Sequence, residues 1–223
     1  MEWRLKPQEL FDLSHSIAAP LLAGLAYPWE ALESIAAFLT ALGETLPPDR
    51  FDHPAGNIWI AKDAQIAPSA SLCGPLIVDE GAQIRHCAFV RGSAIVGKGA
   101  VVGNSTELKN CILFDGAQAP HYNYIGDSIL GYIAHMGAGS ITSNLRSDKG
   151  NITVHGPEIR TGMRKFGAMI GDFAEIGCGS VLNPGTVIGR ETIVYPLSSV
   201  RGCVAEKSIY KHAGEIAARI EKE

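Results

Sequence analysis

The sequence is poor in three features that would have pointed to other kinds of protein. Its cysteines contain no CxxC pair and lie far apart, at Cys73, Cys87, Cys111, Cys178 and Cys203. This spacing argues against a disulfide framework or a zinc site and predicts reduced, partly buried thiols in a cytoplasmic protein. Aromatic residues make up 7% of the chain and charged residues 19%, with a formal net charge of −4. We therefore expect no nucleic-acid binding through the overall charge.

Long apolar runs are also missing. The stretch "SIAAPLLAGLAY" is too short to span a bilayer, and Pro20 interrupts it. The first residues, "MEWRLKPQEL", lack the pattern of a secretory leader. The sequence therefore predicts neither a membrane anchor nor a signal peptide.

What the sequence does contain is a periodicity of six residues. Starting at Ile60, every sixth residue is apolar: Ile66, Leu72, Val78, Ile84, Val90, Val96, Val102, Leu108 and Phe114. The residue four places further on is small in most steps, as at Ala64, Ala70, Ala82, Ala88, Ala94, Ala100 and Thr106. Both rows return from Tyr124 to Ser140, and again from Ile170 to Val200.

A period of six fits neither an amphipathic helix nor an alternating strand, but it is typical of the hexapeptide repeat of a parallel β-helix. Three hexads make one triangular coil, so residues 18 apart stack at the strand spacing of about 4.8 Å. We predict an all-β solenoid over residues 58–204. Twenty-five glycines suit such a turn-rich fold.

Both ends read as helical. Residues 28–42 begin at Pro28, stop before Gly43 and place Leu32, Ile35, Ala36, Leu39 and Leu42 on one face. We therefore interpret residues 1–57 as a helical N-terminal cap and linker that covers the first coil. Residues 205–223 place Ile209, Ala213, Ile216 and Ile220 on one stripe, which predicts a short C-terminal helix.

The six-residue periodicity is interrupted twice. Phe114 and Tyr124 are ten residues apart, and Thr142 and Ile152 are also ten apart, followed by "HGPEIRTGMRKFGAM", which lacks the small-residue row. We interpret both breaks as loops that bulge from a corner of the coil, where solenoids often carry function. The first holds His121, Tyr122 and Tyr124; the second is locally basic, which favours an anionic ligand.

Two cations stand out in the regular part. Arg91 and Lys109 are 18 residues apart and should stack on adjacent coils, with Arg85 in the equivalent place on another side. Like charges on neighbouring strands repel each other, so a partner is needed. Glu107 is one candidate and a bound phosphate is the other; both remain open.

The run "ELKNCILFDGAQAPHYNYIGDSILGYIAHMGAGSITSNLR" resembles the acetyltransferase half of bifunctional glucosamine-1-phosphate acetyltransferase / N-acetylglucosamine-1-phosphate uridyltransferase. The resemblance covers roughly residues 58–204, with "HYNYIGD" and "GAGSITSN" as its most specific segments, and is nearest to the archaeal-type branch. It implies a left-handed solenoid, a cytoplasmic homotrimer with sites between chains, and acetyl-CoA as co-substrate.

The resemblance also implies residue roles. His121 matches the general base and Asn144 a residue that orients the amine. Lys109, Tyr124 and Arg91 match ligands of the sugar phosphate, and His135 stands where relatives contact the sugar or acetyl group. Small residues and amides around Ala168 and Ser180 are expected to line the CoA groove, with Lys149, Arg164 and Lys165 added as CoA or sugar-phosphate contacts by charge alone.

These residue types suit acetyl transfer to an amine. An ammonium group cannot attack a thioester, and a histidine accepts a proton near neutral pH. An aimed amide stabilises the developing oxyanion and phosphate clamps position the acceptor, so the mechanism requires no metal.

The sequence departs from the family in three places. His135 replaces an asparagine and Leu145 a tyrosine, which puts the acceptor's identity in doubt. Residues 1–57 are too short for a nucleotide-binding domain and contain no Gly-rich phosphate loop, so no uridyltransferase half is expected.

Three other functions stay open. One is a hexapeptide acyltransferase acting on a nucleotide-linked amino sugar, and another is a non-catalytic module that binds a sugar phosphate and oligomerises. A γ-type carbonic anhydrase would need three convergent histidines; His86, His121, His135 and His155 lack the expected spacing.

Overall fold

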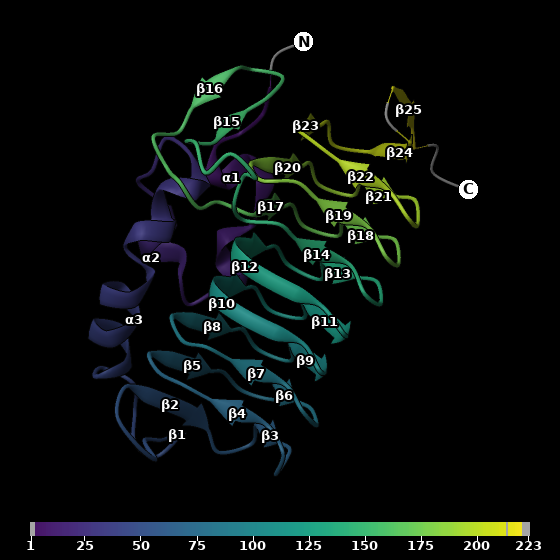
Figure 1. Cartoon of the computed structure of the whole chain (residues 1–223). Coiled ribbons are helices and arrows are strands. Elements are labelled where there is room, and N and C mark those ends of the chain that lie inside the picture. The colour runs from purple at the N-terminus through teal and green to yellow at the C-terminus, as the bar shows by residue number, and fades with distance from the viewer. Residues whose placement is uncertain (1–2, 213, 220–223) are drawn as a thin grey trace.

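The computed structural model describes residues 3–212 and 214–219. The chain from Ile58 onward winds into stacked triangular coils, a parallel β-solenoid (Figure 1). The hexapeptide β-solenoid predicted from the sequence is confirmed. Among the described residues no helix is long and apolar enough to cross a membrane.

The coils present three sides, named here side 1, side 2 and side 3. Side 1 is built of β2 (Ile58–Ala61), β5 (Leu76–Val78), β8 (Ala94–Val96), β17 (Ala168–Ile170), β20 (Thr186–Ile188) and β23 (Cys203–Val204). Side 2 contains β4 (Ser71–Leu72), β7 (Phe89–Val90), β14 (Ile141–Thr142), β19 (Val181–Leu182) and β22 (Ser199–Val200). Side 3 contains β3 (Gln65–Ile66), β6 (Gln83–Ile84), β9 (Val101–Asn104), β11 (Gln118–His121), β13 (His135–Met136), β18 (Glu175–Ile176), β21 (Ile193–Val194) and β24 (Ser208–His212).

Two longer strands, β10 (Glu107–Leu113) and β12 (Tyr124–Leu130), run from side 2 round the corner onto side 1 and pair with each other in parallel. Inside the coils, the apolar side chains of the six-residue periodicity form three stacks. One of them runs through Val78, Val96, Leu113, Leu130, Ile170 and Ile188, all fully buried.

The predicted bulge at the first interruption of the six-residue periodicity is absent from the described coils, and that prediction was wrong. Leu108 and Leu113 occupy successive inward positions five residues apart, where the preceding coil uses six, from Val90 to Val96. The next coil repeats the shortening, between Ile125 and Leu130. The register of the six-residue periodicity therefore shifts by one residue. Leu113 occupies the inward position that counting in sixes assigns to Phe114. Phe114 instead points outward, where its ring lies 5.1 Å from that of Phe11.

The corner without its extra residue is turned by two polar residues with left-handed backbones. Asn110 has φ 51° and Asp127 has φ 46°. Asn and Asp tolerate this region better than other side chains, which explains why they stand here. The same choice places two hydrogen-bonding side chains side by side on adjacent coils.

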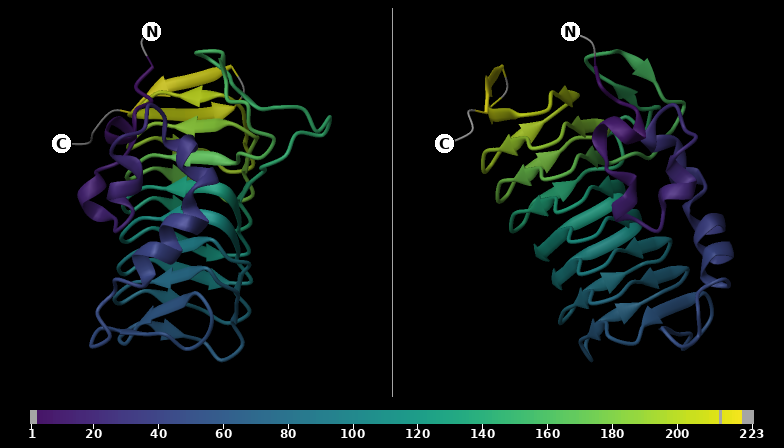
Figure 2. Two further views of the ribbon diagram at one scale, coloured as in Figure 1. Left: turned by 90° about the vertical axis from the view of Figure 1, so that its left-hand side faces the viewer. Right: turned by 180° about the vertical axis from the view of Figure 1, so that it is seen from behind.

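The second break is an insertion, as expected. Thr142 pairs with Leu182, 40 residues on, whereas a regular coil takes 18. Residues 143–166 leave the coil and carry a small antiparallel hairpin of β15 (Thr153–Val154) and β16 (Ile159–Arg160). Figure 2 shows this hairpin standing away from the stack.

The N-terminal helices run along side 1 instead of only covering the first coil (Figures 1 and 2). They are α1 (Pro7–Leu10), η1 (Leu13–His15), α2 (Ala19–Leu22), η2 (Pro28–Glu33) and α3 (Ile35–Gly43). The predicted helix over residues 28–42 is split at Ser34 into a 3₁₀ turn and α3, and Ala36 of its predicted face is exposed. We call residues 3–43 the brace, because they bridge coils that are far apart in sequence.

An apolar column on the outside of side 1 explains this placement. Trp59, Ile77, Ile95, Ile112, Ile129, Met169 and Val187 stack in register and are all buried beneath the brace. Burying each such side chain contributes roughly 1.5–3 kcal/mol, so an exposed column would be costly. Steps of 18 along the sequence reveal only its start, Trp59, Ile77 and Ile95, because the two shortened coils and the insertion change the spacing afterwards.

A buried carboxylate fastens the start of the brace to the later coils. Asp172, with no exposed side-chain surface, accepts the N–H of Asp12 at 2.6 Å and that of Tyr132 at 2.8 Å, and pairs with Arg190 at 3.0 Å. Burial raises the pKa of Asp172, while these donors and Arg190 act against that rise.

The predicted C-terminal helix is wrong. Residues 208–212 form β24 on side 3 and pair with β25 (Glu215–Ala218) as an antiparallel hairpin. Tyr210 continues the inward stack above Val194, which requires an extended chain. Ala213 and Ile220 of the predicted stripe lie outside the described residues.

Candidate functional site

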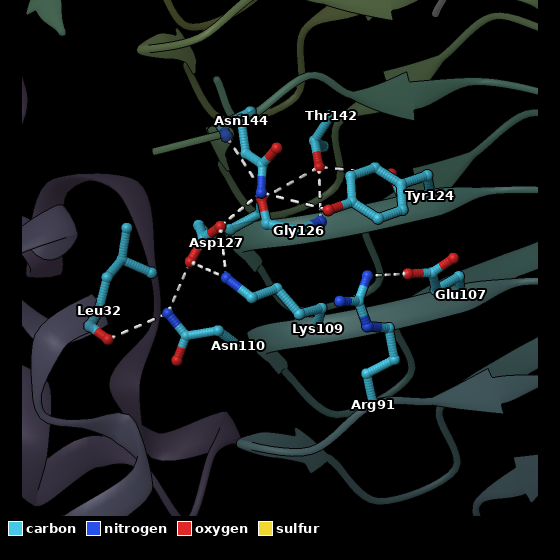
Figure 3. Close-up of polar contacts among 12 residues, drawn as sticks. Leu32, Arg91, Glu107, Lys109, Asn110, Tyr124, Gly126, Asp127, Thr142 and Asn144 are labelled. Atoms are coloured by element: carbon cyan, nitrogen blue, oxygen red, sulfur yellow. Dashed lines mark hydrogen bonds and ion pairs between the residues drawn. The ribbon is translucent and has the colours of Figure 1, made fainter. Parts of the chain in front are cut away.

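The strongest polar cluster lies where β10 and β12 turn from side 2 to side 1. Its centre is Asp127, whose side chain is 5% exposed. Lys109 donates to both carboxylate oxygens, at 2.9 and 3.0 Å, and Asn110 donates to Oδ1 at 2.9 Å (Figure 3). Asn144 also donates, from its Nδ2 to the Oδ2 of Asp127. Because a buried carboxylate needs such partners, Asp127 fixes the position of three side chains at once.

Tyr124 joins the cluster from β12. Asn144 donates its Nδ2 proton to the Tyr124 hydroxyl at 3.2 Å. Burial raises the pKa of Tyr124, and the charges of Asp127 and Glu107 raise it further. The hydroxyl therefore stays protonated at neutral pH and can donate a hydrogen bond to a ligand.

Arg91 and Lys109 occupy successive coils at the same register, as the sequence predicts, but they do not share a partner. Arg91 pairs with Glu107 at 2.8 Å, and Lys109 pairs with Asp127 (Figure 3). The arginine side chain is 49% exposed, so its Glu107 contact leaves donors free for an anion on side 2.

His121 lies at the opposite edge of side 2. It ends β11 on side 3, and the chain turns through Tyr122, with φ 53°, to reach Tyr124 on side 2. Its backbone N–H donates to the side chain of Asn123 at 3.1 Å, and its carbonyl accepts from Gly139 at 3.0 Å. The imidazole itself is exposed.

Asn123 is a residue that sequence reasoning missed. It stands in the small-residue row, is 2% exposed, and donates to the carbonyls of Gly137 at 2.8 Å and Ser140 at 3.1 Å. The signal was available, because a buried amide in place of Ala or Ser needs its own partners. Asp127 and Asn110 were missed as well, although Asp127 ends the segment "HYNYIGD".

Other predicted residues lie elsewhere. His135 is on side 3, where Nδ1 lies 2.9 Å from Glu175 Oε2, away from the Asp127 cluster. Ala168 and Ser180 do not line a surface groove: both are fully buried, with Ala168 N–H bound to Ser128 and the Ser180 hydroxyl bound to Tyr195. Their roles as groove residues are therefore corrected, because the small-residue row faces into the crowded coil.

The cations of the insertion lie in three different surroundings. Arg164 and Lys165 are exposed and line a hollow of about 460 Å³ beside Asp127. Lys149 is exposed and stands apart from this hollow, at a backbone φ of 57°. Arg146 is paired with Asp148 at 2.5 Å, and this hydrogen bond lowers the pKa of Asp148 to about 2. Among the described residues, no group of three or more His, Cys, Asp or Glu could hold a metal ion.

Comparison with known proteins agrees with the class that fold and cluster define, a hexapeptide-repeat solenoid. Residues 72–164 match the family model "GMPPB C-terminal domain". The chain is similar to "Bifunctional protein GlmU" of Methanococcus vannielii, at 30% identity over 70% of this chain and 41% of the relative. A "Bifunctional sugar-1-phosphate nucleotidylyltransferase/acetyltransferase" of Sulfurisphaera tokodaii is 31% identical over 70% of this chain and 39% of the relative.

The resemblance to the acetyltransferase part of the bifunctional proteins is thereby confirmed. The chain spans about two fifths of the length of these relatives. It is also 32% identical to the "Putative uncharacterized acetyltransferase YaiX" of Escherichia coli, over 65% of this chain and 64% of the relative. Among solved structures, the "polySia specific acetyltransferase NeuO" overlaps with a TM-score of 0.46 at 10% identity, covering 75% of this chain and 89% of that one.

Proposed function

We propose that the protein transfers the acetyl group of acetyl-CoA to the amine of a phosphorylated amino sugar, with glucosamine 1-phosphate as the simplest acceptor. The observation that carries the proposal is the arrangement of side 2. His121 lies at one edge, and Lys109 with Tyr124 and Asn144 around Asp127 lies at the other. The bifunctional relatives named above support the acetyl-transfer chemistry.

Each residue then has a stated task. Arg91 and Lys109 hold the phosphate, and the Tyr124 hydroxyl donates to the sugar. His121 removes a proton from the ammonium group, so that the amine lone pair attacks the thioester carbon. The tetrahedral intermediate loses a second proton from its nitrogen to solvent and collapses to the amide with release of the CoA thiolate. No step requires a metal ion.

The direct test mixes the purified chain with acetyl-CoA and glucosamine 1-phosphate, and follows thiol release together with the mass of the N-acetylated sugar. Thiol release without acetylated sugar, or neither, would contradict glucosamine 1-phosphate as the acceptor, and the same result with every amino sugar tested would contradict acetyl transfer. Binding of the sugar phosphate without turnover would instead favour the non-catalytic module.

Loss of the arginine should weaken acceptor binding. We expect Arg91→Ala to raise the KM for the sugar phosphate by about tenfold, because one charge-assisted contact is lost. The KM for acetyl-CoA should stay the same. Arg160→Ala, which removes an exposed cation of the insertion, is the matched control. An unchanged acceptor KM would leave Arg91 as a partner of Glu107 only.

We also propose that the protein forms a homotrimer in which side 2 of one chain faces a neighbour. We propose further that it works in a reducing compartment such as the cytoplasm. The brace covers side 1, and the corner that begins side 2 exposes Tyr122 at 65% and Leu197 at 85%. All five cysteines are unpaired, which suits reducing conditions. Sedimentation velocity should give about three chain masses, and Leu197→Asp should shift it toward the monomer. A stable wild-type monomer would contradict this.

A further inference from the structure

The hollow beside Asp127 is built by parts of the chain that the repeats do not require. Its lining residues come from the brace (Leu32, Glu33), from the corner of β10 and β12 (Asn110, Asp127) and from the insertion (Leu145, Met163, Arg164, Lys165). The volume of about 460 Å³ falls within the range of roughly 300–1,000 Å³ usual for small-molecule sites.

The basic pair in this hollow is held in place without being neutralised. The Met163 carbonyl accepts from Ile152 N at 2.8 Å, and Phe166 N donates to the Asn144 carbonyl at 3.0 Å, so the chain is anchored on both sides of Arg164 and Lys165. Phe166 is fully buried and its ring lies 5.5 Å from that of Trp29 in η2. Neither cation has an ion pair or side-chain hydrogen bond among the described residues.

The carboxylates of the hollow leave a positive excess. Asp127 is already paired with Lys109, so Glu33 is the one lining carboxylate left against two cations. Apart from the Asn110 amide, the remaining walls are apolar: Leu32 is buried, Met163 is half-buried, and Leu145 is 40% exposed. Two cations beside apolar walls match a ligand with phosphates at one end and a flat, weakly polar ring at the other.

We infer that the hollow binds the nucleoside diphosphate portion of the acceptor, so that the acetylated amino sugar is nucleotide-linked. This inference rests on the proposed function, since it names the acceptor class of that same site. Asp127 connects the hollow with the residues of the proposed acetyl-transfer site. It lines the hollow, and its carboxylate accepts hydrogen bonds from Lys109 and from Asn144, which also donates to the Tyr124 hydroxyl (Figure 3). Arg164 and Lys165 contact the phosphate next to the nucleoside, Arg91 and Lys109 keep the phosphate next to the sugar, and Leu145 with Met163 contacts the base.

Calorimetry on the full chain tests this without any turnover, with ADP, GDP and UDP as probes and inorganic pyrophosphate as the anion without a base. At least one nucleoside diphosphate should bind more tightly than pyrophosphate. The Arg164→Ala/Lys165→Ala double variant should weaken that binding at least about tenfold, because hydrogen bonds to charged groups are lost. Lys62→Ala/Arg160→Ala, which removes an exposed lysine and an exposed arginine elsewhere, should leave it unchanged.

A second variant separates a nucleotide site from a simple anion site. Leu145→Ser/Met163→Ser should weaken binding of the nucleoside diphosphate but leave pyrophosphate unaffected. Three results would each overturn the inference. They are no binding of any nucleoside diphosphate, binding that is unchanged in the variant without Arg164 and Lys165, and binding of pyrophosphate as tight as that of the nucleotide.

Failure of the inference is distinguishable from failure of the function. Acetyl transfer to glucosamine 1-phosphate without nucleotide binding would overturn only the inference. Nucleotide binding at the hollow without transfer to any amino sugar would overturn the proposed function and leave a nucleoside diphosphate site.

Discussion

Replacing His121 by alanine should lower kcat for acetyl transfer by roughly 10²–10⁴, the usual contribution of a positioned general base. KM should move less, because a base acts mainly in the transition state. The melting temperature should stay nearly the same, since the imidazole is exposed and the hydrogen bonds of His121 to Asn123 and Gly139 use its backbone.

Steady-state kinetics of the wild type and the variant, with acetyl-CoA and the acceptor, measures this. His86→Ala is the matched control, because His86 is an exposed histidine at the same corner two coils earlier. A variant that keeps more than about a third of the wild-type kcat would show that His121 is not the base. His135, paired with Glu175, is the next residue to test.

Replacing Asp127 by alanine should lower the free energy of unfolding by about 2–4 kcal/mol. Removing one member of a buried ion pair typically costs 3–5 kcal/mol, and Lys109 keeps a quarter of its side chain exposed, which places the expectation at the lower end. The acetyl-transfer rate should fall as well, because Asn144 and Lys109 lose the acceptor that orients them.

Chemical denaturation measures the loss, with Asp148→Ala as the control. Asp148 also pairs with an arginine but is exposed, and surface pairs contribute little, so the control should unfold like wild type. The Lys109→Met/Asp127→Leu double variant should be more stable than Asp127→Ala, because it leaves no charge unpaired. If Asp127→Ala and Asp148→Ala unfold alike, the cluster is not what holds this corner together.

Much of the fold follows from repetition. An aliphatic residue every six positions can be buried only if the chain turns at regular corners, so the coil was predictable from Ile66, Leu72 and their successors. The insertion at 143–166 was predictable too, because its residues lack the small-residue row. Local pattern was insufficient where one residue shifts the register, as between Leu108 and Leu113.

The same limit applied to the ends and to the site. Ile209 and Ile216 fit a helical stripe and a strand equally well at short range, and pairing with Val194's strand decided between them. The resemblance supplied Lys109, Tyr124 and Asn144, which the structure brings together, and also Ala168 and Ser180, which it buries.

The sequence by itself determined the repeating coil and its insertion, because these depend on composition and on spacing along the chain. Only the tertiary structure decided that the brace lies on side 1, that Asp127 gathers Lys109, Asn110 and Asn144, and that Arg164 and Lys165 border a hollow next to them. The physical reason is that these contacts join residues 17 or more positions apart, and burial rather than local propensity selects them.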